Sequence, residues 1–298
     1  MQRRIFLQNS LLTLGALTLS RQKIVQAMSA DPWKITMLTD TIGIFTEKGG
    51  TIAFHYSKDG ITVVDAQFPD TAPHLINELK KRNDQPYRLL INTHHHGDHT
   101  SGNIAFKGLV NRVLAHENSL ANQKRVTIAN KTEDKQLYPT QTFEKVWKES
   151  AGKEKISLNY YGAGHTNGDA IIHFEHANIA HVGDLVFNRR HPYVDRSAGA
   201  NIKSWINVLE ETLKKFDNKT IFICGHSGND FDVKGQKDML VAFQDYLGNV
   251  LKLVGDEIKA GKSKEEILKS TTIPGSSEWK GDGIERPLEA AFEELSEA

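Results

Sequence analysis

Short apolar stretches separated by turns open the chain after residue 30. Four of them are rich in β-branched residues, and Gly-Gly and Asp-Gly steps between them are typical of tight turns. They span residues 33–38, 42–46, 51–56 and 61–65. We expect these stretches to form an antiparallel meander. Asp65, at the end of the last strand, is expected to be a turn or helix-capping carboxylate.

Helices and further strands are expected in the middle of the chain. Residues 71–81 and 202–216 each have one apolar face at helical spacing, and another helix begins near Asn118. The polar segment 130–142 is expected to be a surface loop at the rim of a substrate site. Short β-branched or apolar runs predict strands at residues 88–91, 112–115, 155–160, 170–175, 179–182 and 220–224.

Beyond Gly228 the hydrophobic pattern becomes helical. Apolar residues at helical spacing between Leu240 and Ile258 predict a long helix that packs on the core. Ser263 and Glu266 form a capping box for the next helix, and a last helix is expected at residues 287–295. We therefore expect residues 31–298 to form one α+β domain, of which residues 231–298 are a helical C-terminal extension.

The N-terminal segment has the pattern of an export signal. Arg3 and Arg4 precede a mild apolar run at residues 11–19, which is too short to span a bilayer comfortably. The arginine pair resembles a twin-arginine signal, which directs the export of folded proteins. We expect residues 1–27 to be removed after Ala27, which leaves no stable membrane anchor and places the mature protein in the periplasm.

Composition and charge narrow the choice of partners. Lys+Arg and Asp+Glu are equal at 37 each, so nothing indicates binding to nucleic acid or to an anionic membrane. We expect a small-molecule substrate, and the oligomeric state is left open. The single cysteine, Cys224, excludes an intrachain disulfide and is expected to face the core rather than to bind a metal.

The loop after the strand at residues 88–91 concentrates candidate metal ligands. They are two imidazoles one residue apart, then a carboxylate and a third imidazole, namely His94, His96, Asp98 and His99. Imidazole and carboxylate are ligands of zinc and similar ions, and a catalytic site leaves one position open for water. Gly97 lets the loop aim the first two at one ion and the last two at another, so we expect two divalent ions. These are expected to be zinc, with iron or manganese as alternatives, and His95 should point elsewhere.

Three later segments repeat the placement of a ligand after a strand and a glycine. The ligands are His165, Asp184 and His226. The two imidazoles of the first loop need a third protein ligand to make a site with an open position, which favours His165. A carboxylate in this position suits a ligand that bridges two ions. Surface or turn roles are expected for His55, His74, His95, His116, His173, His176, His181 and His191.

Together these loops resemble those of the metallo-β-lactamase superfamily. The resemblance covers residues 33–228 and is strongest in the segment from His94 to His99. It implies a four-layered αβ/βα sandwich with the metals in a cleft between two sheets. The ligand sets that it implies are His94, His96 and His165 for the first ion, Asp98, His99 and His226 for the second, and Asp184 as a bridge between the ions.

Departures from the β-lactamases within this superfamily bear on the substrate. Their best-known subclass has cysteine where Asp184 stands, and a lysine three residues later, where this chain has Phe187. This favours the glyoxalase, lactonase and related esterase branches, although residues 91–94 and 115–118 look lactamase-like. Arg189 and Arg190 are candidates to hold a substrate carboxylate, but arginines in exposed loops are often only solvated.

The expected chemistry follows from the paired ions. Two cations about 3.5 to 4 Å apart lower the pKa of a bridging water, so that hydroxide can attack a carbonyl near neutral pH. Asp98 would orient the hydroxide and carry its proton to the leaving group. We expect a metal-dependent hydrolase that uses a metal-bound hydroxide at a dinuclear site to cleave an ester, lactone, thioester or amide bond. The alternatives are a β-lactamase and, from another class, an iron-dependent sulfur dioxygenase.

Overall fold

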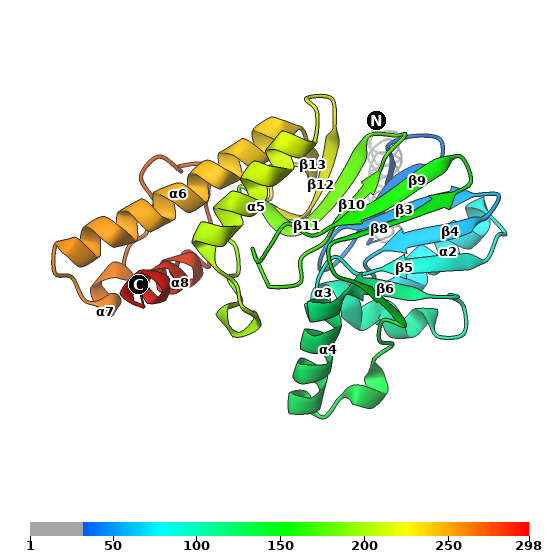
Figure 1. The fold of residues 1–298 in the computed structure, drawn as a ribbon, viewed down its shortest axis with the longest axis horizontal. Coiled ribbons are helices and arrows are strands. Elements are labelled where there is room, and N and C mark those ends of the chain that lie inside the picture. The colour runs from blue at the N-terminus through cyan, green and yellow to red at the C-terminus, as the bar shows by residue number, and fades with distance from the viewer. Residues whose placement is uncertain (1–31, 298) are drawn as a thin grey trace, which may run out of the picture. The chain divides into compact units, whose positions relative to one another are not determined.

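Two β-sheets packed face to face carry the architecture of the chain from Ile35 onward (Figure 1). The computed structural model describes residues 32–297. Residues 1–27, for which we expect an export signal, lie outside this part of the chain. Within residues 32–297, no helix is both long enough and apolar enough to cross a membrane.

The first sheet has seven strands and the second has six. In spatial order, the first sheet contains β1 (Lys34–Met37), β2 (Ile42–Thr46), β3 (Ile52–Ser57), β4 (Gly60–Val64), β5 (Tyr87–Ile91), β6 (Val113–His116) and β7 (Gln141–Phe143). The second sheet contains β13 (Lys234–Gly235), β12 (Ile221–Ser227), β11 (Ile179–Asn188), β10 (Ile171–Phe174), β9 (Glu154–Asn159) and β8 (Val146–Ala151). The expected antiparallel pairing holds from β2 to β4, whereas β4 to β7 and the pair β11 and β12 run parallel.

Helices cover the outer face of each sheet. The helices α2 (Ala72–Arg82) and α4 (Glu117–Asn130) pack against the first sheet. The second sheet is covered by α5 (Ile202–Lys215), α6 (Lys237–Lys259) and α8 (Glu285–Ser296), which lie together in Figure 1. Two short helices, α3 (Gly97–Thr100) and α7 (Lys264–Ile267), complete the set within residues 32–297. The layers follow the order helix, sheet, sheet, helix, so the expected α+β sandwich with additional C-terminal helices is confirmed.

Two apolar clusters fill the spaces between these layers. The cluster between the sheets contains Ile91 and Leu114 from the first sheet and Leu158 from the second. The cluster under the C-terminal helices surrounds Trp205 and Phe243, which are both fully buried. Burial of apolar surface on this scale is the main force that favours folding. The expected apolar face of α5 and the capping box at Ser263 are both present. The hydrophobic and capping patterns of this C-terminal part of the chain were therefore predicted correctly.

The segment from residue 130 to residue 151 contains more regular structure than we expected. It includes a 3-10 turn at Glu133–Lys135 and the strands β7 and β8, neither of which was predicted. Most residues of β8 are exposed or half-buried, because it is an edge strand that pairs only with β9. An edge strand needs few apolar residues, so the alternation of hydrophobic residues that identifies other strands is weak here.

The strand β11 continues past its expected end at residue 182. Gly183, which suggested a loop, has a φ of 54° and lies at a register shift against β12, after which the strand runs on to Asn188. A Cβ atom on Gly183 would lie 2.8 Å from the side chain of Thr93. The glycine is therefore required for a bulge and a close approach inside the strand. Consequently, Asp184 is a buried strand residue and does not lie in a loop.

The buried carboxylate of Glu294 joins α8 to the N-terminus of α5. It accepts hydrogen bonds from the backbone N–H groups of Ile202 and Lys203 at 2.7 and 3.1 Å. We expect Glu294→Gln to lower the free energy of unfolding by about 1–3 kcal/mol, since one buried N–H loses its charged acceptor. Urea unfolding measures this change. The matched Glu293→Gln change removes only an exposed ion pair with Lys264 and should cost below about 1 kcal/mol, so equal losses would contradict the assignment.

Candidate metal centre

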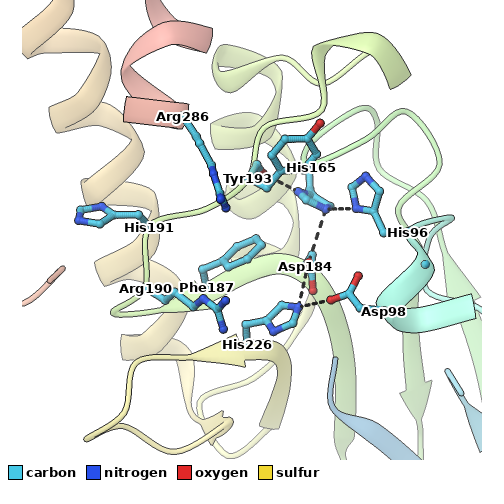
Figure 2. Close-up of a pocket in the computed structure, with 11 residues that line it drawn as sticks. His96, Asp98, His165, Asp184, Phe187, Arg190, His191, Tyr193, His226 and Arg286 are labelled. Carbon is cyan, nitrogen blue, oxygen red and sulfur yellow. Dashed lines mark hydrogen bonds and ion pairs between the residues drawn. The ribbon is translucent and has the colours of Figure 1, made fainter. Parts of the chain in front are cut away.

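The seven residues expected to bind metal converge at one edge of the two sheets. Figure 2 shows His96, Asp98, His165, Asp184 and His226 among them. The short helix α3 follows β5 and presents Asp98 and His99, while His94 and His96 precede it in the same loop. His165 lies in the loop between β9 and β10. Asp184 and His226 lie on the neighbouring parallel strands β11 and β12.

The first group of side chains consists of three imidazoles. The Nδ1 atom of His96 lies 3.0 Å from Nε2 of His94 and 2.8 Å from Nε2 of His165. A single proton cannot satisfy three nitrogens that point at one another, whereas a cation between them can. Oδ2 of Asp184 lies 3.9 Å from His94 Nε2 and 3.5 Å from His165 Nε2. This geometry fits a metal site with open coordination.

The second group lies on the other side of Asp184. Nε2 of His226 is 2.9 Å from Oδ2 of Asp98 and 3.5 Å from Oδ2 of Asp184. Nε2 of His99 is 3.8 Å from Oδ2 of Asp98 and 3.1 Å from Oδ1 of Asp184. The carboxylate of Asp184 therefore reaches both groups, as a bridging ligand would.

Two buried atoms in this cluster lack a hydrogen-bond partner. His99 Nε2 and Asp184 Oδ1 are both inaccessible to water, and their geometry does not make a hydrogen bond although they are 3.1 Å apart. Buried polar atoms are nearly always satisfied, so two unpaired atoms this close to each other need an explanation. A divalent cation bound between them satisfies both, and the side chains present therefore fit such an ion.

The pKa shifts in the cluster favour metal binding. Burial, with the neighbouring His99, holds the pKa of His94 well below its usual range, and burial lowers the pKa of His165 to about 3. Both imidazoles are thus neutral at physiological pH, as ligands must be. Burial alone would raise the pKa of Asp98, but His99 and His226 outweigh it and lower the pKa to about 2.

The pKa of His99 is shifted by the negative charge of the surrounding carboxylates. Burial acts to lower its pKa, but Asp184, Asp65 and Asp98 together raise that pKa well above the usual value. The same three carboxylates would attract a metal ion to this place. The site therefore provides a position where positive charge is strongly stabilised.

Asp65 supports the second group and was assigned wrongly from the sequence. It is fully buried, and its carboxylate accepts hydrogen bonds from the backbone N–H and the hydroxyl of Thr93 at 2.8 and 2.7 Å. Its Oδ2 atom also lies 2.7 Å from Nδ1 of His99. The residue follows β4, which is a parallel neighbour of β5, so their carboxyl ends meet at one edge. The closeness of these two strand ends was the signal that could have identified Asp65 as part of the site.

Asp195 plays a similar part for the first group and was not singled out in the sequence. Its Oδ2 atom lies 2.9 Å from Nε2 of His96 and 3.4 Å from Nε2 of His95. His165 is held in the same way, because its Nδ1 atom lies 2.8 Å from the carbonyl oxygen of Tyr193. Partners on the second ring nitrogen fix the tautomer and the orientation of a ligating histidine. His95 is not a member of the first group, and its Nε2 atom shares Oδ2 of Asp195 with His96.

Several other histidines are buried, in contrast to the surface or turn roles expected for them. They are His55, His95, His116, His181 and His191. His116 caps α4 by accepting from the N–H of Asn118, and His181 contacts the backbone of Thr51 and Gly183. Their roles are structural. The expected burial of Cys224 is confirmed, and burial raises the pKa of its thiol to about 12.

A cavity of about 310 Å³ opens beside the cluster (Figure 2). Besides metal-centre residues, it is lined by Phe187, Tyr193, Arg190 and Arg286. Of the two loop arginines singled out in the sequence, only Arg190 therefore borders the cavity. Arg189 turns away to pair with Glu278 at 3.1 Å. No sequence pattern pointed to Arg286, since it lies far along the chain on α8.

We expect Asp65→Asn to weaken metal binding by about 10-fold to 100-fold, because the amide has one acceptor oxygen and cannot accept from the Thr93 N–H, the Thr93 hydroxyl and the His99 ring together as the two carboxylate oxygens do. Asn tolerates the positive φ of 66° at this position, so the backbone should be retained. Competition with a zinc chelator measures the affinity, and circular dichroism checks the fold. Asp70→Asn, which alters only an exposed pair with Lys48, is the control. Unchanged affinity in Asp65→Asn would disprove the supporting role.

Curated relatives share between a fifth and a quarter of their residues with this chain. The metallo-beta-lactamase IND-1 of Chryseobacterium indologenes is 22% identical over 192 residues, which cover 62% of this chain and 76% of the relative. A metallo-beta-lactamase type 2 of Bacillus cereus is 25% identical over 203 residues, which cover 64% and 75% of the two chains.

Solved structures show the same fold. A metallo-beta-lactamase from Pontibacter korlensis superposes with a TM-score of 0.62 at 19% identity and covers 73% of this chain and 99% of its own. A stereoselective inverting sec-alkylsulfatase from Pseudomonas sp. superposes with a TM-score of 0.70 at 12% identity and covers 87% of this chain and 49% of its own.

The segment matched by the family comparison includes the candidate metal centre. The profile described as metallo-beta-lactamase superfamily matches residues 52–226, from β3 to the last of the seven clustered side chains. The helices α6, α7 and α8 lie beyond this segment. Since the match spans more than half of the 298 residues, the chain belongs to the metallo-beta-lactamase superfamily.

Proposed function

We propose that this chain is a dinuclear metal-dependent hydrolase that cleaves an ester, lactone, thioester or amide bond in a small molecule. Metal-dependent hydrolysis is consistent with membership of the superfamily and with the clusters of histidine and aspartate. The observation that carries the dinuclear proposal is the position of Asp184, whose carboxylate lies 3.5 Å from His165 of the first group and 3.1 Å from His99 of the second. Zinc is the metal that we propose, and iron and manganese accept the same ligands.

The side chains divide between two ions in this proposal. His94, His96 and His165 would hold the first, Asp98, His99 and His226 the second, and Asp184 would bridge them. When bound, two such ions supply an acidified water molecule and a Lewis acid that polarises a carbonyl oxygen.

Protein groups around the ions would orient the reactants and handle the proton. The side chain of Asp98 is 31% exposed and borders the cavity, so its carboxylate can orient a water molecule and accept a proton from it at Oδ2. The proton can then pass from Oδ2 to the leaving group. Phe187 stacks against His226 with ring centroids 5.5 Å apart, which fixes that imidazole and excludes water from one wall.

A second candidate function is β-lactam hydrolysis. It is supported by the names of the curated relatives, which are metallo-beta-lactamases. The side chain of Phe187 argues against it, because it stands where the best-known lactamases carry a lysine for the carboxylate of the drug. We therefore place ester or lactone hydrolysis first.

We expect the zinc-loaded protein to hydrolyse a simple lactone or a chromogenic ester, and to lose this activity when a chelator removes the metal. Asp98→Ala and His96→Ala should each lower kcat/KM by about 100-fold or more, because each removes a metal ligand and Asp98 also accepts a proton. Asp70→Ala is the control, since its carboxylate is exposed and pairs only with Lys48. Full activity in a folded Asp98→Ala or His96→Ala protein would refute the proposal.

Metal analysis and an oxygen electrode complete this test. Two ions per chain and no oxygen uptake support the hydrolase. A single iron with oxygen uptake on a persulfide substrate would instead support the sulfur dioxygenase alternative.

We expect a simple lactone to be opened with a higher kcat/KM than a chromogenic cephalosporin. At the position of Phe187, the charged hydrogen bond to the carboxylate of a cephalosporin is missing. We expect its absence to lower kcat/KM for the cephalosporin by about tenfold or more. Both substrates are compared on the same zinc-loaded preparation, with chelator-treated protein as the blank. Faster, chelator-sensitive opening of the cephalosporin would make β-lactam hydrolysis the assigned function.

A further inference from the structure

Part of the cavity wall is cationic. Two guanidinium groups, from Arg190 and Arg286, border the cavity (Figure 2). The carboxylates among its lining residues are those of Asp98 and Asp184, which belong to the proposed metal centre. No lining carboxylate is therefore left to neutralise the two arginines.

Arg190 is held in place by the residues on either side of it. Arg189 has a φ of 57°, pairs with Glu278 and lies over the ring of Trp279 at 5.0 Å. His191 is buried, and its Nδ1 atom lies 2.8 Å from the hydroxyl of Tyr246 on α6. The backbone of Arg190 is thus anchored at both ends to the C-terminal region, while its own side chain is exposed.

Arg286 comes from the first turn of α8, which packs on α5 and α6, the other helices that cover the second sheet. Leu288 and Ala291 of α8 are fully buried, and Glu294 binds the N-terminus of α5. A side chain on a helix held in this way is placed more accurately than one on a mobile loop. Helix α8 thus brings a cation from the end of the chain to the mouth of the site.

Neither guanidinium is neutralised by a close protein partner. Within residues 32–297, the side chain of Arg190 makes no hydrogen bond or ion pair. Arg286 has one ion pair there, a contact of 3.9 Å with Glu285 between two side chains that are more than half exposed. Such a pair contributes little. Arg286 also borders a second cavity with Glu289 and Glu293, but both of these pair with Lys264.

We propose that the substrate carries an oxyanion, a carboxylate or a sulfonate-like group, which Arg190 and Arg286 bind while the bond to be cleaved lies at the metal centre. This inference rests on the proposed hydrolase function and adds the substrate class to it. A guanidinium binds an oxyanion through two parallel N–H groups, which fixes orientation as well as charge. Arg190 and Arg286 are specificity-determining residues in this proposal.

The position of Arg286 makes this wall a feature of the C-terminal helices. The segment that matches the superfamily ends at His226, and α8 begins at Glu285. The enzyme core and the anion-binding wall therefore come from different parts of the chain. An arginine from α8 selects the substrate without altering the residues that hold the metal.

A binding experiment tests the proposal without requiring turnover. Isothermal titration of the zinc-loaded protein uses three probes of the same size, namely 4-nitrobenzoate, 4-nitrobenzenesulfonate and the neutral 4-nitrobenzamide. We expect at least one anion to bind about 10-fold to 100-fold more tightly than the amide, as charged hydrogen bonds of ordinary strength predict. The better anion shows whether a two-oxygen or a three-oxygen group fits.

Arginine variants locate the bound anion. Arg190→Met and Arg286→Met should each weaken binding of that anion by about tenfold and leave the amide unaffected, and Arg286→Lys should restore part of the loss. Arg82→Met, on the distant helix α2, is the control with the same loss of charge. Anion binding that is unchanged in both Met variants would place the anion on the metal ions and overturn the proposal, as would equal binding of the anions and the amide.

A kinetic comparison separates this proposal from the hydrolase proposal. With 4-nitrophenyl acetate and the mono-4-nitrophenyl ester of glutarate, we expect Arg286→Met to raise KM for the anionic ester alone and to leave kcat nearly unchanged. If the neutral ester is hydrolysed but the anionic ester has no advantage, the hydrolase proposal stands and the anion proposal fails. If neither ester is hydrolysed, the hydrolase proposal loses its support, while the titrations still decide whether the two arginines bind an anion.

Discussion

The buried carboxylate of Asp184 is the constraint on which the rest of the site depends. A carboxylate removed from water costs several kcal/mol unless charges and hydrogen bonds compensate for it. Burial acts to raise its pKa, but His226 and His99 outweigh that effect and hold the pKa well below the usual value. The compensating imidazoles come from two other segments, because His99 follows β5 and His226 lies on β12, whereas Asp184 lies on β11. The edges of both sheets must therefore meet before this charge can be buried.

Glycines allow the backbone to approach the clustered side chains closely at this edge of the sheets. A Cβ atom on Gly225 would collide with Oδ1 of Asp184, and one on Gly50 would collide with the ring of His99. Gly50 belongs to the turn between β2 and β3, and Gly225 lies inside β12. Turn geometry alone does not account for either residue. Both are required because the clustered side chains pack directly against the backbone, Asp184 against the neighbouring strand β12 and His99 against the turn between β2 and β3.

The C-terminal helices complete the cavity without supplying any of the seven clustered side chains. Helix α6 binds the loop after β11 through Tyr246 and His191, and α8 places Arg286 beside the same loop. The hydrolytic centre and the wall that would select the substrate are thus carried by different layers of the fold. This division is the physical basis for treating the chemistry and the substrate class as separate questions, which separate experiments can answer.

The sequence by itself determined the order of most strands and helices, the α+β class and the seven side chains that cluster, because periodic apolar residues and ligands after glycine are local patterns. Local patterns missed the edge strands β7, β8 and β13 and ended β11 too early, at the bulge of Gly183. Only the tertiary structure decided that Asp65 and Asp195 contact the candidate ligands His99 and His96 and that Arg286 reaches the cavity. Those contacts join residues that lie far apart in the chain, and no local pattern records which distant backbone a polar side chain will meet.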